Sequence, residues 1–335
     1  MKKTPTLSYL IPAYNAEAFI ENCLNSILEI NLSKEIIIVN DGSTDKTGEI
    51  IDRYAGQYEF IHAYHQANAG ESAARNTALA HATGKWIQHV DADDIVINDT
   101  NDFNAIFELA EQKQADVIKG LYLFSKEGQQ NAITQPVFDA VKEHKAVTTS
   151  GRNFLDKCIG EFHFQQNGCF FMRRATLEKL GLKFDTTQYI GPDILFFLEL
   201  FCSNITVIEV PYVFYYYQTR LGSVSNPSKT VLDLKIIRSR AKLLEKSLAL
   251  AAKYGIQNSP YIHYTLLEYR LILTQDYNML LKAGYPKEKA DAEQFSQYIF
   301  SPEEYKIAKQ HHQQIYDRQD GRAYYQKIAP KNQRN

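Results

Sequence analysis

Two carboxylates separated by one residue, Asp91 and Asp93, stand directly after an apolar segment at 86–90. At the end of a strand, side chains two residues apart point to the same face. Carboxylate oxygens are suitable ligands for Mg²⁺ or Mn²⁺, and Mg²⁺ typically keeps several waters and bridges to phosphate oxygens. The pattern therefore predicts a divalent cation beside phosphate groups. An acidic loop that caps a helix would contain the same short triplet.

A second candidate segment is Pro12-Ala13-Tyr14-Asn15, which follows the apolar residues 7–11. The flat ring of Tyr14 could pack against a nucleobase. The alternative is a plain strand-to-helix turn in which Asn15 caps the following helix.

A third segment, Asn40-Asp41-Gly42-Ser43-Thr44-Asp45, follows the apolar residues 35–39. The Asp41 carboxylate can accept a hydrogen bond from a uracil or ribose group. Gly42 permits a tight turn, and residues 43–45 can cap the next helix. Capping alone would explain most of this run, but it does not require an acid at position 41.

The fourth segment, residues 66–76, contains Gly70 and Arg75. The glycine lets the backbone approach a ligand closely. Arg75 lies one turn into the predicted helix, from where it could point back at a nucleotide. An arginine on the protein surface is the alternative.

The order of apolar and amphipathic segments predicts how these four candidates are positioned. The predicted strands cover 7–11, 35–39, 60–64 and 86–90, and the predicted helices cover 18–30, 44–54 and 71–81. This βαβα rhythm predicts a right-handed, doubly wound sheet flanked by helices, which is an α/β fold. Ligands of such sheets bind outside the carboxyl ends of the strands, so all four segments are expected at one rim.

Beyond residue 100 the pattern is mixed as far as about 225 and helical afterwards. Helices are predicted at 103–114 and 194–201, and strands at 117–124, 168–172 and 205–208. Helical spacing of apolar residues then covers 232–254 and 261–281, and Ser301-Pro302 begins a further helix. We therefore expect a domain at 1–225 and an all-helical region at 226–335.

The composition narrows the class of protein. The chain has 335 residues, 44% of them hydrophobic, and a formal net charge of -2, so no basic face for nucleic acid is expected. No apolar run reaches the roughly 18 residues that span a bilayer, so any membrane contact would be peripheral. The four cysteines lack zinc-site spacing and are predicted to be buried, reduced thiols of a cytoplasmic protein. They are Cys23, Cys158, Cys169 and Cys202.

The segments PAYN, VNDGSTD, NAGESAARN and VDADD resemble, in this order, the opening motifs of the inverting glycosyltransferases of family 2. The resemblance implies a GT-A fold, with a Rossmann-like, mixed and mostly parallel sheet, and a nucleotide-sugar donor, with UDP favoured. It implies that Mn²⁺ or Mg²⁺ binds Asp93. The implied donor-binding residues at the four segments are Pro12, Ala13, Tyr14, Asp41, Asn68, Arg75, Asp91 and Ala92.

Two later sites are also implied by this resemblance. The family carries a general base after a second acid, and the matching residues here are Gly191-Pro192-Asp193, so Asp193 would be the catalytic base while Pro192 replaces the usual acid. The segment 215–223 is similar to a loop that folds over the diphosphate, which makes Arg220 a donor-binding candidate. At least some tyrosines of this segment are expected in the core instead.

The implied acceptor is a hydroxyl of a glycan or polymer, such as a capsule, lipopolysaccharide or wall polymer. The helical region at 226–335 would bind the acceptor, the membrane surface or another subunit, and its periodicity does not choose among them.

Three rival classes make different demands on the sequence. A sugar nucleotidyltransferase would carry a G-x-G-T-R loop after the first strand, and a dinucleotide-dependent oxidoreductase would carry G-x-G-x-x-G there. The chain has Pro12-Ala13-Tyr14-Asn15 at that place. A non-catalytic binding or assembly module on the same fold is the third rival, and the presence of Asp93 and Asp193 argues against it.

Overall fold

A computed structural model describes residues 4–97, 103–125, 146–158, 167–218 and 234–318. The chain divides into two compact units, each built from several stretches of sequence. Unit 1 comprises Met1–Gly151, Gln165–Thr186 and Asn204–Asn226, and unit 2 comprises Arg152–Phe164, Thr187–Ser203 and Pro227–Asn335. The units are therefore not consecutive segments, since the residues around 152–164 and 187–203 group with the C-terminal helices. The functional division at 225/226 stays a prediction.

Unit 1 is built on one mixed sheet. Its strands are β1 (Leu7–Ala13), β2 (Lys34–Asp41), β3 (Ile61–Gln66), β4 (Trp86–His89), β5 (Ile95–Val96), β6 (Val117–Ser125), β7 (Val147–Ser150), β8 (Phe170–Arg173) and β9 (Thr206–Gln218). Their spatial order is β3-β2-β1-β4-β8-β6-β9-β5, with β7 paired to β9. Pairing is parallel from β3 through β4 and between β6 and β9, and antiparallel elsewhere.

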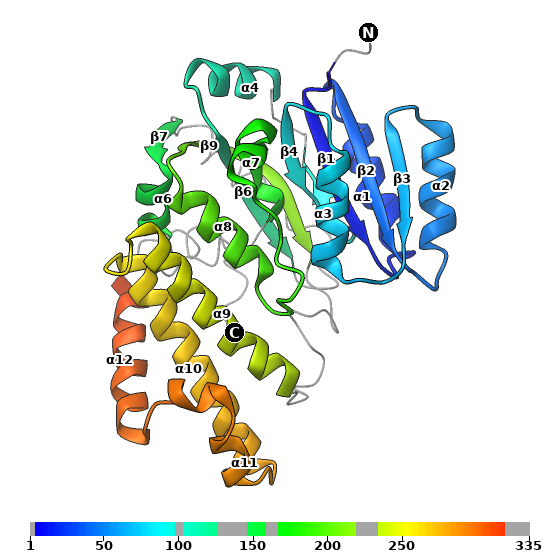
Figure 1. Cartoon of the computed structure of the whole chain (residues 1–335). Coiled ribbons are helices and arrows are strands. Elements are labelled where there is room, and N and C mark those ends of the chain that lie inside the picture. Colours follow the sequence, from blue (N-terminus) through cyan, green and yellow to red (C-terminus); the bar gives the residue numbers. More distant parts are fainter. Residues whose placement is uncertain (1–3, 98–102, 126–145, 159–166, 219–233, 319–335) are drawn as a thin grey trace, which may run out of the picture. The chain divides into compact units, whose positions relative to one another are not determined.

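The helices of unit 1 follow from this strand order. They are α1 (Ile20–Leu28), α2 (Thr47–Gln57), α3 (Glu71–His81), α4 (Phe103–Gln112) and α7 (Arg174–Leu180). The chain steps outward from β1 to β3 through α1 and α2, then returns through α3 to β4 beside β1. Because parallel crossovers are right-handed, this reversal places α3 on the opposite face from α1 and α2. Figure 1 shows α3 in front of β1 and β2.

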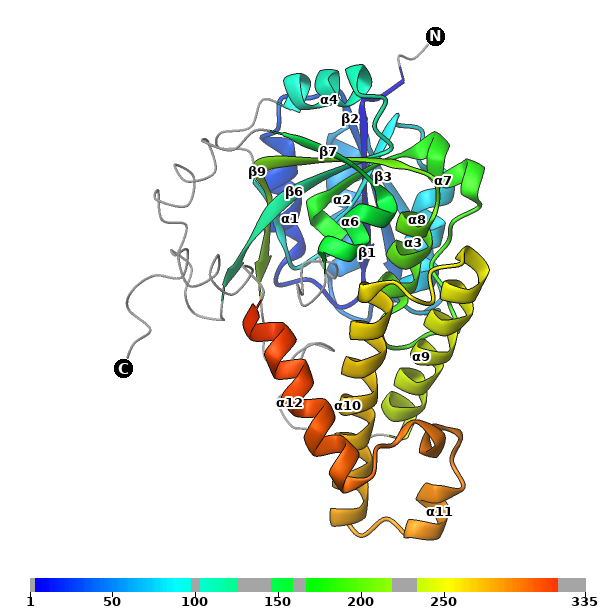
Figure 2. The same ribbon diagram turned by 90° about the vertical axis from the view of Figure 1, so that its left-hand side faces the viewer.

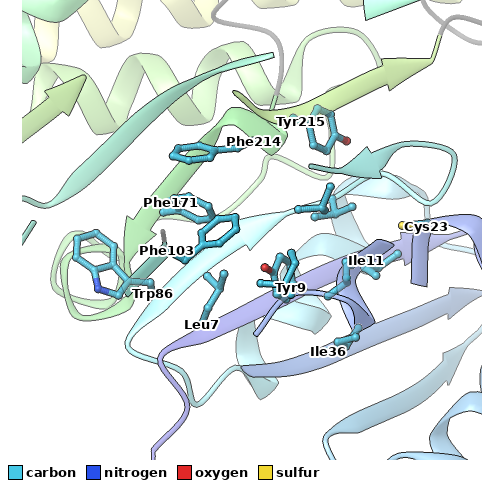
Figure 3. Close-up of a cluster of buried hydrophobic side chains, with 14 of the residues drawn as sticks. Leu7, Tyr9, Ile11, Cys23, Ile36, Trp86, Phe103, Phe171, Phe214 and Tyr215 are labelled. Atoms are coloured by element: carbon cyan, nitrogen blue, oxygen red, sulfur yellow. The ribbon is translucent and has the colours of Figure 1, made fainter. Parts of the chain in front are cut away.

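An aromatic core joins the two halves of the sheet in unit 1. Trp86, Phe171 and Phe214 are fully buried, and the ring centroids of Phe171 and Phe214 lie 4.7 Å apart. Figure 3 shows these rings clustered with Phe103 next to Leu7 of β1. Burying such rings removes a large apolar area from water, which makes this cluster a principal source of stability.

Unit 2 contains mostly helices. They are α6 (Gly151–Lys157), which begins at the end of unit 1, α8 (Pro192–Cys202), α9 (Leu234–Tyr254), α10 (Pro260–Lys282), α11 (Lys287–Asp291), the 3₁₀ turn η3 (Gln294–Tyr298) and α12 (Pro302–Arg318). Figure 2 shows α9 and α12 on either side of α10, in agreement with their packing. A buried apolar cluster joins Ile194 of α8, Leu243 of α9 and Leu273 of α10. In the part of the chain that the structure describes, no helix is long and apolar enough to cross a membrane.

The expected fold class is confirmed: a mixed sheet is flanked by helices and followed by C-terminal helices. Two local expectations need correction. Asp193 was expected ahead of its helix, but Pro192 starts α8, so Asp193 lies in its first turn. The strand at 205–208 extends to Gln218 and so contains the tyrosines, because parallel pairing with β6 continues along its length.

A glycine in the short 3₁₀ turn Asn167–Cys169 provides the space for the ring of Tyr215. A Cβ atom at Gly168 would lie 2.0 Å from that ring. We expect Gly168→Ala to lower the free energy of unfolding by about 1–3 kcal/mol, because the buried ring would have to move. Urea denaturation measures this.

Gly56 of α2 is the matched control, since a Cβ atom there meets no described atom within 4 Å. Alanine is the better helix former, so Gly56→Ala should stabilise the protein by about 0.5–1 kcal/mol. A Gly168→Ala protein as stable as the parent would contradict the close packing of Tyr215.

Candidate active site

The four candidate segments meet at one edge of the sheet in unit 1, as predicted. Ala13 is opposite Asn40 in the parallel ladder, and Asp41 is opposite Gln66. The Val90 amide donates to the carbonyl of Leu10, which brings the end of β4 beside β1. The carboxyl ends of β1, β2, β3 and β4 therefore share an edge, where α/β sheets bind their ligands.

The segment after β1 is tied to the segment after β2 by side chains of both. The backbone N–H of Asn15 donates to Ser43 Oγ (3.0 Å), and the Thr44 amide donates to Asn15 Oδ1 (2.9 Å). Asn15 has a positive φ of 48°, a conformation that asparagine tolerates better than most residues. Tyr14, the residue before Asn15, is 51% exposed, whereas Pro12 and Ala13 are buried. The Tyr14 ring is therefore available to a ligand.

Asp41 organises the neighbouring loop. Its carboxylate is 2% exposed and accepts hydrogen bonds from Gln66 Nε2 (2.7 Å) and from the amides of Ala69 (2.9 Å) and Gly70 (2.8 Å). The exposed Asn68 donates from its side chain to the Asp41 carbonyl (2.9 Å). Most of the hydrogen-bonding capacity of Asp41 is thus used to shape the backbone before α3. Capping of the next helix does not account for this acid.

Arg75 is buried, which excludes the surface alternative. Its side chain is 4% exposed, and one nitrogen, Nη2, donates to Glu71 Oε1 (2.7 Å) and Asp91 Oδ1 (2.8 Å). Its guanidinium carbon lies 5.2 Å from the ring centroid of Phe184. Burial and the charge of Arg75 lower the pKa of the neighbouring His89 to about 3. The guanidinium therefore holds Asp91 in place from beneath the rim.

The acidic segment after β4 forms a tight turn. The Asp94 amide donates to the carbonyl of Asp91 (3.0 Å), which places Asp93 near the tip. Asp94 is 1% exposed, whereas Asp91 and Asp93 are half-buried. Burial raises the pKa of Asp94 well above its usual value, and the charges of Asp91 and Asp93 raise it further.

A tyrosine hydroxyl from a distant strand holds this turn. Tyr215 Oη of β9 donates to Asp94 Oδ2 (2.6 Å) and accepts the backbone N–H of Asp91 (3.0 Å). The Gln218 amide donates to the other carboxylate oxygen of Asp94 (2.8 Å). Asp94 is therefore an internal anchor, and the two half-buried carboxylates are left at the rim.

The donor set of this turn fits a divalent cation. Asp91 and Asp93 concentrate negative charge at the rim, whereas the buried anchor Asp94 is the acid least suited to bind a ligand. No group of three or more metal-ligating side chains occurs among the described residues. Magnesium sites that bind phosphates commonly use only one or two protein carboxylates, with phosphate and water as the other ligands. Asp93 with Asp91 meets that requirement.

Two candidates remain, Asp193 and Arg220. Asp193 belongs to unit 2, as the second residue of α8, and is half-buried. A negative charge in the first turn of a helix is favoured by the helix dipole. Arg220 lies outside the described residues.

Sequence reasoning missed the linking roles of Tyr215, Asp94 and Gln218. The available signal was the tyrosine run at 215–217, since a buried tyrosine hydroxyl usually needs a hydrogen-bond partner. The expectation that some of these tyrosines lie in the core is confirmed, because Tyr215 and Tyr216 are buried.

Tyr215→Phe tests the hydroxyl link. The substitution removes a donor to Asp94 and an acceptor for the Asp91 amide, so it should lower the free energy of unfolding by about 1–3 kcal/mol. The matched control is Tyr216→Phe, since the buried Tyr216 hydroxyl has no hydrogen-bond partner among the described residues. The free energy of unfolding of Tyr216→Phe should stay within about 0.5 kcal/mol of the parent value. Equal effects of the two substitutions in urea denaturation would refute the link.

Comparison with known proteins agrees with this geometry. Residues 8–181 match the model of glycosyl transferase family 2. The glycosyltransferase EpsJ of Bacillus subtilis is 32% identical over 255 residues, which are 75% of this chain and 71% of EpsJ.

Two solved structures share the fold. TarS 1–349 of S. aureus, in complex with UDP, has a TM-score of 0.58 at 16% identity and covers 96% of this chain and 91% of its own. The mannosyltransferase PcManGT of Pyrobaculum calidifontis, with GDP-Man and Mn²⁺, has a TM-score of 0.52 at 18% identity, covering 97% and 87%. From its motifs, its sheet and these matches, the chain belongs to glycosyl transferase family 2.

Proposed function

We propose that this protein transfers a sugar from a nucleotide-sugar donor, with a UDP-sugar favoured, to a hydroxyl of a glycan acceptor with inversion at the anomeric carbon. The observation that carries the proposal is the acidic turn after β4. Its two rim carboxylates, Asp91 and Asp93, share the edge of the sheet with the exposed ring of Tyr14. A base-stacking ring and a cation-binding acid at one rim suit a nucleoside diphosphate.

The donor-binding roles follow from exposure and existing bonds. Tyr14 contacts the base, with Pro12 and Ala13 forming the buried floor beneath it. Asn68 is exposed and contacts Asp41, which holds the loop of Asn68 in shape. Asp91 and Ala92 approach the ribose and diphosphate, while Arg75 acts through Asp91 because its guanidinium is already bound there. Arg220 is proposed as a further diphosphate ligand on the family resemblance alone.

A divalent cation, Mn²⁺ or Mg²⁺, would be held by Asp93 and would neutralise charge on the departing diphosphate. A supporting parallel is PcManGT, which was solved with GDP-Man and Mn²⁺. TarS, solved with UDP, supports a uridine donor in the same way.

Asp193 is the proposed general base. As the acceptor oxygen attacks the anomeric carbon, the carboxylate of Asp193 takes the hydroxyl proton. The bond from that carbon to the diphosphate oxygen breaks, and its electron pair leaves with the nucleoside diphosphate. A single displacement inverts the configuration and requires no covalent sugar-enzyme intermediate. The proposed acceptor is a bacterial surface polysaccharide, on family analogy.

The proposed location is the cytoplasm, with any membrane contact peripheral. All four cysteines are buried, as predicted, and none is part of a disulfide among the described residues, which suits a reducing compartment.

Asp193→Asn tests the base. The amide cannot take a proton at neutral pH, so turnover should fall by about 10²–10⁴-fold, the usual range for general base catalysis. The dissociation constant for UDP with Mn²⁺ should stay within about twofold, because Asp193 is not among the residues proposed to bind the nucleotide or the cation. Turnover is measured as release of nucleoside diphosphate from the sugar nucleotide that stabilises the protein most. Near-normal turnover would rule out Asp193 as the base.

Asp93→Asn tests the cation site. Saturating UDP with Mn²⁺ should raise the apparent stability of the parent, by about 2.7 kcal/mol at one hundred times the dissociation constant. The variant should lose most of this gain. The control, Asp52→Asn, changes an exposed acid of α2 and should keep the full gain in stability from UDP with Mn²⁺. A thermal-shift panel of nucleotide sugars, each with and without Mn²⁺, measures both. A full Mn²⁺-dependent gain in Asp93→Asn would remove Asp93 from the site.

A further inference from the structure

The loop that precedes α8 is bound to α9 through its backbone. The amides of Tyr189 and Ile190 both donate to Ser239 Oγ, at 3.1 and 2.9 Å. Gln188 Nε2 donates to the carbonyls of Ser239 (2.7 Å) and Ile190 (2.8 Å). Gln188 and Ser239 are 4% and 6% exposed, so these bonds are shielded from water. All of these residues belong to unit 2.

The end of this loop packs on the same helix. Gly191 is the N-cap of α8 and has a φ of 70°, a left-handed conformation that favours glycine. A Cβ atom at Gly191 would lie 2.7 Å from Leu243. The absence of a side chain therefore lets the start of α8 pack directly against α9, two residues before Asp193.

The contacts from α9 come from one face of that helix. Lys235 Nζ lies 4.0 Å from the ring centroid of Tyr189, and Lys246 Nζ donates to Thr187 Oγ1 (2.9 Å). The contacting residues of α9 are thus Lys235, Ser239, Leu243 and Lys246. Their spacing of four, four and three residues places them on one helical face. This face runs about 16 Å along the helix.

We propose that α9 is a positioning element for the general base: Ser239, with Gln188, holds the loop 187–191 so that α8 begins at Pro192 and presents Asp193 in one orientation. This inference rests on the proposed function, because it takes Asp193 as the base. It assigns to the C-terminal helices a role other than binding the acceptor, a membrane or another subunit. Ser239 touches no reacting atom and acts only through the backbone of this loop.

Pro192 takes the place of the acid that the family resemblance implies before the base. The proline side chain therefore cannot accept a hydrogen bond that would orient the segment. Pro192 instead suits the first position of a helix, where its fixed φ is compatible and its lack of an N–H carries no penalty. Orientation of Asp193 then comes from the helix start and from the bonds to Ser239.

Ser239→Ala tests this positioning role, with Ser247→Ala as the matched control. Ser247 is on the same helix, is fully buried, and its Oγ has no hydrogen-bond partner within the described part of the chain. Without the Ser239 acceptor, we expect exchange of the Tyr189 and Ile190 amides with deuterium to accelerate at least about tenfold. Turnover should fall about ten- to a hundredfold, the effect of a misplaced catalytic group. For Ser247→Ala, the turnover and the dissociation constant for UDP with Mn²⁺ should both stay within about twofold of the parent values.

The dissociation constant for UDP with Mn²⁺ is measured in each variant, well below its unfolding temperature, and should not change in Ser239→Ala. Faster amide exchange with unchanged turnover would overturn the inference and leave the base assignment standing. Equal losses of turnover in both serine variants would also overturn it, since they would reflect general weakening of α9. Should Asp193→Asn retain turnover, the base assignment itself fails.

If Ser239→Ala does not fold, Gln188→Met serves as the second variant. It keeps the side-chain volume and removes the three donations of Gln188 Nε2, to the Ile190 carbonyl and to the carbonyl and hydroxyl of Ser239. The same loss of turnover at unchanged UDP affinity is expected, and its absence would count against the positioning role.

Discussion

The hydroxyl of Tyr215 is the contact on which the rest of the site depends. The turn after β4 places three carboxylates in four residues, an arrangement that their mutual repulsion opposes. One hydroxyl group both donates to Asp94 and accepts the Asp91 amide, so the central strand β4 and the distant strand β9 are joined at the rim. Gly168 leaves room for this contact, because a Cβ atom at that position would overlap the tyrosine ring.

Two buried charged residues, Arg75 and Asp41, bind groups of the rim. Arg75 is buried at the start of α3 and directs its guanidinium to Asp91. Asp41 is buried at the end of β2 and accepts the amides of the two residues that precede α3. Neither residue is freely available to solvent, so in the proposed function both would contribute to donor binding by fixing the shape and charge of the rim. Preorganised groups of this kind bind a charged ligand without a further cost of reorganisation.

In unit 2, neutral groups also hold a segment of backbone in a fixed conformation. A single serine hydroxyl accepts two backbone amides from the loop before α8. The loop is short and its Tyr189 and Ile190 amides are bound to Ser239, so few alternative conformations remain for it. The residues Thr187–Ser203 belong to the same compact unit as the C-terminal helices, although they lie earlier in the sequence. Helix α9 can therefore determine the geometry of the segment that contains Asp193.

The sequence by itself determined the strands and helices of the first hundred residues, because a buried parallel strand must be apolar and its helices amphipathic. From this order followed the shared rim and the identity of Tyr14, Asp91 and Asp93 as its candidate residues. Local pattern also placed most of the C-terminal helices.

Only the tertiary structure decided which acid is an anchor and which residues hold it. The spacing of Asp91 and Asp93 did not reveal the role of the adjacent Asp94, which is an anchor because Tyr215, 121 residues further along the chain, reaches it. Ser239 likewise gains its partners from a loop about 50 residues earlier. Such contacts depend on long-range packing, which periodicity cannot specify, because a helix or strand pattern describes a face of an element and not what lies against it.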